Sequence, residues 1–403
     1  MGRINQIFFL LIVWLTLTST APFIFYTWPG HPYKLLTITL LLVMVAFLLK
    51  SKIRISIDQN IIAIIFVVII YYLTVTMIYY NYSNFNLCIQ FIALFIIILF
   101  INTFIGFEKF VKSYINIILI MAIGGVLAFF IHFFIGISPI FEVKYSATGI
   151  SYFLGLTTSN DYYNLEGLRV MRYAGFFDEP GTFGLFSLFA IILNKIYFDN
   201  RKIEKWLIFL TLFTFSLAFI IIIFVYIFLV YFKISYIKYA ILPVLLIVAF
   251  YFALANYKGN NQSIIIIKTM TLDRFKMDDK GTLSGNNRYA ASLHDKNVFL
   301  ENPFLGVQVD DMVRGNNQYS VFAKHGIFGS LFYYAFLNYF LILTMKLKKD
   351  KKIFFLKMFL VIILNFFHRP EFSAVLTLLI IYSMINYLNQ NSKEAFNKQL
   401  KIC

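Results

Sequence analysis

Long apolar runs follow one another along most of the chain, and they constrain the fold more than any other feature of the sequence. They fall at residues 7–27, 35–49, 61–80, 87–105, 114–135, 181–198, 206–232, 239–256, 324–345, 353–368 and 373–390. A helix needs about 20 mainly apolar residues to cross the hydrocarbon core of a bilayer. We therefore expect an all-α, polytopic bundle of transmembrane helices, with residues 1–403 forming a single membrane domain.

Composition excludes the other broad fold classes. Of all residues, 60% are hydrophobic, 20% aromatic and 13% charged, whereas a soluble domain is roughly half apolar and a quarter charged. This aromatic content is not typical of a disordered chain, and continuous apolar runs differ from the alternating pattern of an outer-membrane barrel. The sequence holds no Walker A motif, G-x-G-x-x-G motif or Cys/His cluster, so we expect no nucleotide, metal or other cofactor.

The run at 206–232 leaves the number of spans open, because it fits either one tilted helix or two short helices folded as a hairpin. Thr214, Phe215 and Ser216 are the candidate bend. Cytoplasmic loops are enriched in Lys and Arg. With a hairpin and a cytoplasmic N-terminus, the cytoplasmic side holds 21 of the 35 Lys and Arg but only 6 of the 19 Asp and Glu. We therefore predict about 12 spans with both termini in the cytoplasm.

Two long polar segments, residues 136–180 and 257–323, then lie on the outer side of the membrane. Connections longer than about 15 residues are usually functional or disordered. Because these two segments hold most of the unusual polar residues, we expect them to be partly ordered and to carry the functional site.

The first candidate site precedes the span at 181–198 and contains Arg169, Arg172 and Glu179. Pro180 suits the first turn of a helix, where its missing N–H costs nothing. Arg172 is the preferred ligand-binding residue, because a guanidinium binds phosphate or carboxylate through two parallel hydrogen bonds. The alternative is a helix cap with basic residues at the membrane interface.

Three further candidates follow. The second runs over residues 286–311 and contains Arg288. The third runs over residues 316–329 and contains Asn317 and His325, and the fourth runs over residues 368–371 and contains Arg369 and Glu371. The alternatives are an ordinary loop arginine, an interfacial histidine, and an Arg–Glu pair that anchors a turn. In the arrangement with 12 spans all four segments reach the outer membrane face, so their arginines are expected to share a site for an anionic lipid headgroup such as a pyrophosphate.

Three patterns in this order resemble a known family. They are Arg172-x-x-Gly175-x-Phe177-x-Glu179-Pro180, Arg288 with Glu301-Asn302-Pro303-Phe304-Leu305-Gly306-Val307, and Asn316-Asn317-Gln318-Tyr319 with His325-Gly326-x-x-Gly329. Together with the spans, they are similar to the O-antigen polymerase and O-antigen ligase superfamily of bacterial inner membranes. Gln308 replaces a glycine that is common in the family, and Leu217 replaces the basic residue that follows the element Thr214-Phe215-Ser216. Ligases usually carry a His-Asn pair where this chain has Asn316-Asn317, which favours a polymerase.

The resemblance implies an inner-membrane glycosyltransferase of the GT-C type with a periplasmic active site. It would move a growing glycan from undecaprenyl pyrophosphate onto the non-reducing end of a new lipid-linked repeat unit, for lipopolysaccharide O-antigen. Expected partners are these lipid-linked oligosaccharides, membrane lipids, a chain-length regulator and a flippase, with no nucleic acid. The residues that we assign to catalysis are Arg288, His325 and Glu179, and those that we assign to pyrophosphate or glycan binding are Arg172, Arg169, Arg369, Glu371 and Asn317.

Three alternatives stay open at this point. An O-antigen ligase and a capsule or exopolysaccharide polymerase share the chemistry, and a lipid-linked oligosaccharide flippase would be no enzyme. Flippases tend to bury charges within their spans, whereas the predicted spans here are nearly free of charge and Lys357 lies near the cytoplasmic end of its span. The sequence therefore favours the enzyme over the flippase.

Overall fold

The computed structural model describes most of the chain outside its N-terminal run and the middle of the second polar segment. The described residues are 32–50, 58–145, 148–160, 162–165, 168–232, 249, 252–259, 264, 268, 288–309, 312–314, 317–368 and 375–400. For residues 32–37, 144–145, 148–149, 162–165, 168–170, 288–289, 368 and 391–400 the backbone alone is described.

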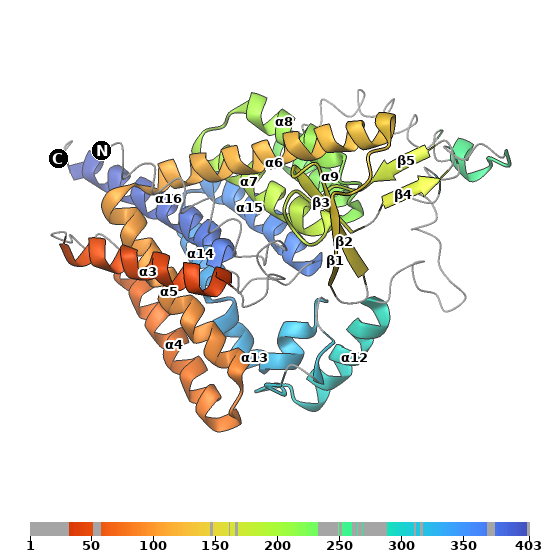
Figure 1. Cartoon of the computed structure of the whole chain (residues 1–403). Helices are drawn as coiled ribbons and strands as arrows, with labels where there is room; N and C mark the ends of the chain where they lie inside the picture. Colours follow the sequence, from red (N-terminus) through yellow and green to blue (C-terminus); the bar gives the residue numbers. More distant parts are fainter. Residues whose placement is uncertain are drawn as a thin grey trace.

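Helices dominate these residues (Figure 1). The helices are α3 (Pro32–Lys50), α4 (Gln59–Tyr79), α5 (Tyr82–Phe104), α6 (Phe107–Ile135), α7 (Pro180–Tyr197), α8 (Arg201–Leu212), α9 (Leu217–Tyr231), α12 (Arg288–Glu301), α13 (Ser320–Tyr333), α14 (Ala335–Met345), α15 (Lys349–His368) and α16 (Val375–Leu400). Five short strands lie between α6 and α7: β1 (Phe141–Tyr145), β2 (Thr148–Phe153), β3 (Thr157–Ser159), β4 (Tyr162–Leu165) and β5 (Leu168–Met171).

The apolar helices are those of a membrane protein. Among the described residues, α4, α5, α6 and α7 are each long and apolar enough to cross a bilayer. A fifth crossing results if α13 and α14, which are bent by 44° relative to each other, form one broken span. The predicted run at 7–27 lies outside the described residues, and α9 is shorter than a full span. The total of about 12 spans therefore stays a prediction.

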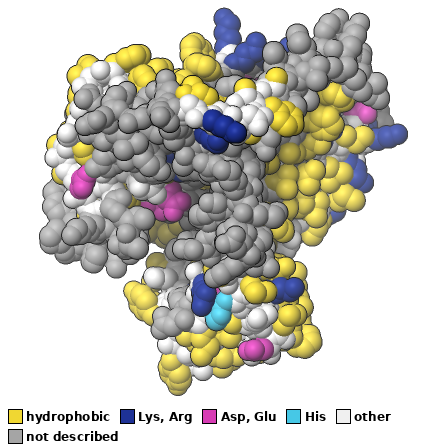
Figure 2. All heavy atoms as spheres, turned by 90° about the vertical axis from the view of Figure 1, so that its right-hand side faces the viewer, with side chains coloured by type: hydrophobic (Ala, Val, Ile, Leu, Met, Phe, Trp, Pro, Cys, Tyr) yellow, Lys and Arg dark blue, Asp and Glu magenta, His cyan; other side chains and the backbone are white. Residues whose placement is uncertain are grey.

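Large apolar side chains cover much of the described surface. Phe66, Met77, Ile120, Phe134 and Phe224 are each more than half exposed. In Figure 2 apolar side chains form a broad patch on the right of the view, and the charged side chains lie at its edges. Apolar patches of this breadth are unusual on soluble monomers. They are the surface expected for helices that face lipid.

Helix α7 is at the centre of the bundle, because almost all its side chains are buried. It packs against α6, α8, α9, α15 and α16. Phe186 stacks on Phe177 in the segment before α7, and Phe189 contacts Phe366 of α15. Pro180 occupies the first turn of α7, as the sequence predicts. The start of α7 therefore holds the first candidate segment against the core.

The first polar segment is ordered around two small antiparallel sheets, which the sequence analysis did not predict. One sheet has the order β1-β2-β3 and the other pairs β4 with β5. Phe141 of β1 lies opposite Tyr152 of β2, and their rings stack at 4.2 Å. Figure 1 places these strands at the end of the bundle opposite the C-terminal part of α16.

The run at 206–232 contains a break at Phe213–Ser216 between α8 and α9, at the predicted bend. Phe215 has a positive φ of 49°. The Thr214 hydroxyl donates to the Thr211 carbonyl, and the Ser216 hydroxyl accepts from the Phe219 N–H. Short polar side chains therefore satisfy the backbone groups that the break exposes.

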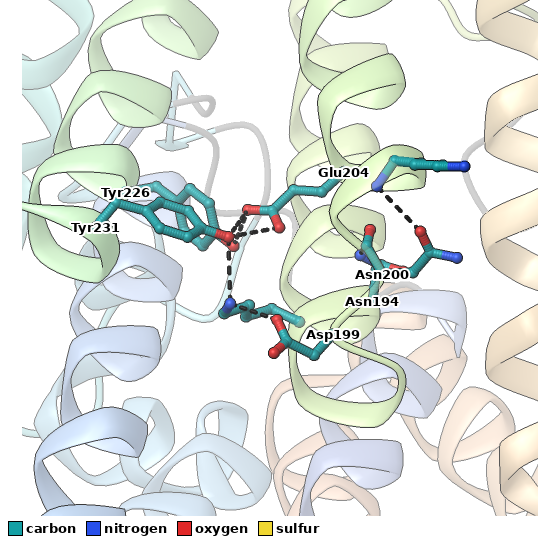
Figure 3. A network of polar contacts seen from close by, with 8 residues as sticks. Asn194, Asp199, Asn200, Glu204, Tyr226 and Tyr231 are labelled. Carbon is teal, nitrogen blue, oxygen red and sulfur yellow. Dashed lines mark hydrogen bonds and ion pairs between the residues drawn. The ribbon is translucent and has the colours of Figure 1, made fainter.

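A buried carboxylate holds α8 and α9 as an antiparallel hairpin (Figure 3). Glu204 of α8 accepts hydrogen bonds from the hydroxyls of Tyr226 at 2.7 Å and of Tyr231 at 2.8 and 2.6 Å. Glu204 lies in the first turn of α8 and Tyr231 ends α9, so these bonds require opposite helix directions. Lys195 of α7 donates to Tyr231 and pairs with Asp199. The network thus ties three helices at one end of the hairpin.

We predict that Glu204→Ala destabilises the protein by about 3 kcal/mol, because two buried tyrosine hydroxyls lose their acceptor. Glu204→Gln keeps an acceptor oxygen and should cost less. The unfolding midpoint of each purified variant in detergent measures the effect, with the exposed Lys205→Ala on the same helix as the control. Equal midpoints for Glu204→Ala and Lys205→Ala would show that the network does not hold the hairpin.

Candidate functional site

The first candidate segment is fixed against strand β3. The Thr158 hydroxyl donates to the carbonyls of Gly175 and Phe177, at 3.2 and 2.6 Å. Gly175 has a φ of +60°, and a Cβ there would lie 2.7 Å from the Phe183 ring, so the chain requires glycine at this turn. The Tyr173 hydroxyl donates to the Leu210 carbonyl of α8 at 2.7 Å, and burial raises its pKa. The segment therefore bridges β3 and the α8–α9 hairpin.

Arg172 points to the break between α8 and α9. Its Nε donates to the Thr214 carbonyl at 3.3 Å, and Nη2 donates to the Phe215 carbonyl at 3.2 Å. A cation at the carbonyl end of a helix is stabilised by the helix dipole. The sequence predicts that this guanidinium binds pyrophosphate, and that role stays a prediction. Two of the partners that the structure gives it are these backbone carbonyls.

Asp178 and Glu179 lie at the N-terminus of α7. The Thr182 hydroxyl in the first turn of α7 donates to Asp178 at 2.8 Å. Glu179 occupies the N-cap position with a φ of −141°, and its side chain makes no cap hydrogen bond. Glu179 is partly buried. The positive end of the α7 dipole stabilises its negative charge.

The second and third candidate segments are joined by backbone hydrogen bonds. Residues 303–308 lie along α13 at Gly326, where the helix has a non-helical φ of 63°. The N–H groups of Val307 and Gln308 donate to α13, at 3.0 and 2.8 Å, and α13 donates to the carbonyls of Pro303 and Phe304, at 2.8 and 3.2 Å. A Cβ at Gly306 would overlap Lys324, and one at Gly326 would overlap Phe304. Both glycines are therefore needed for this close approach.

Gln308 adopts a left-handed backbone conformation with a φ of 56°, which glycine adopts most easily. In the family that the sequence resembles, this position is often glycine. The Gln308 side chain offsets part of this strain. Gln308 Nε2 donates to the Leu305 carbonyl at 2.6 Å, and Asn84 Nδ2 donates to Gln308 Oε1 at 3.2 Å. Asn81 donates to the Gln308 carbonyl. The turn between α4 and α5 thus lies at the same end of the bundle as the second polar segment.

Asn317 is held by a carboxylate that the sequence analysis did not single out. Asp295 of α12 is fully buried and accepts from Asn317 Nδ2 at 2.6 Å and from the Arg314 N–H at 2.8 Å. Asn317 Oδ1 in turn accepts from the Tyr319 N–H at 2.9 Å, just before α13 begins. Asp295 therefore fixes the start of α13 relative to α12.

His325 is buried between aromatic side chains just before the kink. Its ring lies edge-on to Tyr72 of α4 at 5.7 Å and stacks with Tyr333 at 5.6 Å. The neighbouring Lys324 donates to the Ser83 hydroxyl at the start of α5. The structure thus gives His325 a buried position rather than the interfacial one that the sequence analysis names as its alternative.

A groove of about 330 Å³ lies between the broken span α13–α14 and α15. Its walls are mostly apolar and include Phe322 and Ile327 of α13 and Ile363 of α15. Gln318 of the third candidate segment and Phe367, which directly precedes the fourth segment, also line it. Apolar clefts with a few polar groups are typical small-molecule sites. The groove brings the third segment next to the helix that leads to the fourth.

Several predicted residues are outside what the structure describes. Arg369 and Glu371 are not described, and for Arg169 and Arg288 the backbone alone is described, at β5 and at the start of α12. The convergence of Arg172, Arg288 and Arg369 on one site therefore stays a prediction. Within the described part of the chain, no three His, Cys, Asp or Glu side chains lie close enough to hold a metal ion.

We predict that Gln308→Ala lowers the free energy of unfolding by about 1 kcal/mol more than Gln308→Gly. Both variants lose the amide hydrogen bonds, but the alanine keeps the strained left-handed backbone that glycine adopts freely. Chemical unfolding of both purified variants in detergent measures the difference. If alanine proves as stable as glycine, residue 308 does not have a positive φ in solution.

We predict that Asp295→Asn and Asn317→Asp each destabilise the protein by about 2 kcal/mol. The first variant places two amide donors opposite each other in the buried pair, and the second places two carboxylate acceptors opposite each other. The double variant restores a donor opposite an acceptor and should recover part of the loss. A double-mutant cycle on unfolding free energies measures the coupling, with the exposed Lys296→Ala on α12 as the control. Additive effects would mean that the two side chains do not bond.

Known proteins offer no template for this site. Comparisons of the chain with protein-family models, with curated proteins and with solved structures find no match. The functional argument therefore depends on the residues and geometry of this chain.

Proposed function

We propose that this chain is a membrane glycosyltransferase that polymerises lipid-linked glycan repeat units, of the type that builds O-antigen. The observation that carries this proposal is the groove between α13, α14 and α15. Its apolar walls suit a lipid chain, and its polar residues, among them Gln318, Ser330 and Asn338, suit a hydrophilic group joined to that lipid. A lipid-linked sugar has both parts.

The kinked helix α13 supports the same proposal. Discontinuous helices place polar backbone and side chains inside a membrane protein where they line a functional site. His325 lies three residues after Phe322 and two before Ile327, and both of these line the groove. The ring of His325 faces Tyr72 of α4, and the kink at Gly326 follows it directly.

In the proposed reaction the glycan leaves undecaprenyl pyrophosphate and joins the non-reducing sugar of a new repeat unit. Cationic side chains then lower the energy of the departing diphosphate. Arg172, Arg288 and Arg369 are the proposed cations, with Arg169, Glu371 and Asn317 as further binding residues. His325 or Glu179 accepts the proton of the attacking hydroxyl. The active site faces the periplasm in this proposal, and neither a nucleotide nor a metal takes part.

We predict that Ile363→Trp, which fills the groove from α15, abolishes long glycan chains. Ile353→Trp is the matched control, because Ile353 is exposed on the same helix and is not among the groove residues. Each variant is expressed in a host that lacks its own polymerase, and the ladder of glycan lengths is read on a gel. Wild type and Ile353→Trp should give ladders, and Ile363→Trp should give single repeats.

The same strains separate the alternatives. A host without the chain should accumulate single repeats if the chain is a polymerase. Free lipid-linked polymer would instead indicate a ligase, and repeats that stay on the inner leaflet would indicate a flippase. A normal ladder from Ile363→Trp would remove the groove from the proposal.

A further inference from the structure

The segment between α12 and α13 carries large apolar side chains on its surface. Phe304 is 63% exposed and Leu305 is 48% exposed. Both belong to the second polar segment, which the sequence analysis places outside the membrane. Single exposed apolar residues are ordinary on a soluble surface, so the backbone and the neighbouring helices decide what these two contact.

The backbone of this segment finds its hydrogen-bond partners inside the protein. The carbonyls of residues 303–305 all accept hydrogen bonds, two from α13 and one from the Gln308 side chain. The N–H groups of residues 306–308 all donate, one to the Asn302 carbonyl and two to carbonyls of α13. Non-helical backbone is stable at membrane depth only where protein groups satisfy it. Exposed apolar side chains on a satisfied backbone are therefore the combination that a lipid environment requires.

Phe304 packs on the part of α13 that faces lipid. Its ring stacks on Phe328 with 6.1 Å between the centroids, and Phe328 and Leu331 are each more than half exposed. Helix α13 is the first half of the broken span. Phe328 is its ninth residue, about 12 Å along the helix from Ser320. Phe304 thus extends an exposed apolar face that lies well inside the span.

Tyrosines mark the same level of the bundle on the neighbouring helices. Tyr79, Tyr80 and Tyr82 surround the turn between α4 and α5, and all three are exposed. Asn81 in this turn donates to the Gln308 carbonyl, so the turn and the segment after α12 lie side by side (Figure 1). Tyrosine is enriched at the boundary between water and hydrocarbon, because its ring is apolar and its hydroxyl is polar. The turn therefore indicates where that boundary lies.

We propose that Phe304 and Leu305 form a membrane anchor that inserts into the bilayer beside α13. The partner is the lipid of the leaflet at this end of the bundle. Its acyl chains contact the two apolar side chains, while the exposed Glu301 and Asn302 lie among the headgroups. The second polar segment is then attached to the membrane as well as to α13.

The same face of α13 borders the groove. Ile327 and Leu331 are exposed and also line the groove. Phe328, which carries the Phe304 ring, lies between them in the sequence. The groove therefore opens sideways to lipid in this proposal, as a ligand carried in the bilayer requires. This part deepens the proposed function and rests on it for the identity of the ligand.

Spin labels on single cysteines test the anchor. Phe304→Cys is made in a chain whose native thiols are removed by Cys88→Ala and Cys403→Ala, and the labelled protein is reconstituted into phosphatidylcholine vesicles. Oxygen concentrates in hydrocarbon, whereas a nickel chelate stays in water. We predict that the ratio of oxygen to nickel collisions at residue 304 is about fivefold higher than at residue 296. Lys296→Cys on the exposed side of α12 is the matched control, and Phe66→Cys on α4 is the lipid reference.

A ratio at residue 304 as low as that at residue 296 would overturn the anchor, because the side chain would then lie in water. Leu305→Cys should behave like Phe304→Cys and replaces it if that variant does not fold. Leu331→Cys should give the ratio of the lipid reference, and high nickel accessibility there would overturn the sideways opening of the groove. The labels need no glycan substrate, so they decide the anchor even if the proposed function fails.

Discussion

Backbone groups inside a membrane protein have no water to bond with, so each break in a buried helix must be satisfied by other parts of the chain. Two of the breaks among the described helices follow that constraint. At the α8–α9 break, Arg172 donates to the carbonyls of Thr214 and Phe215. At Gly326, residues 303–308 exchange backbone hydrogen bonds with α13. The polar segments outside the helices are therefore held in place by hydrogen bonds to the breaks in the helices.

This constraint explains where the candidate site lies. The second and third segments meet because the kink at Gly326 needs partners, and the groove forms beside the same broken span. The first segment is joined to the bundle through α7, since Asn365 of α15 donates to the Leu185 carbonyl of α7 at 3.2 Å. A rigid central helix thus connects the segment of Arg172 to the helix that forms one wall of the groove.

Three of the described carboxylates join helices through hydrogen bonds. Glu204 joins α8 to α9 and Asp295 joins α12 to the start of α13. Asp58, before α4, accepts from Tyr339 of α14 at 2.8 Å and from Asn389 of α16 at 2.9 Å. A carboxylate removed from water is stable only when several donors replace its hydration. Each of the three accepts from at least two donors. Because hydrogen bonds are directional, each carboxylate favours one particular arrangement of the helices that it joins.

The sequence by itself determined that the chain forms apolar helices, that the run at 206–232 bends at Thr214–Ser216, and that α7 begins at Pro180. Run lengths, turn residues and proline are local signals, so they can be read without the fold. Only the tertiary structure decided that Asp295 holds Asn317, that Arg172 meets the α8–α9 break and that His325 is buried against Tyr72. These partners lie 22 to 253 positions apart in the sequence, and pairing at that distance depends on how the helices pack rather than on any local pattern.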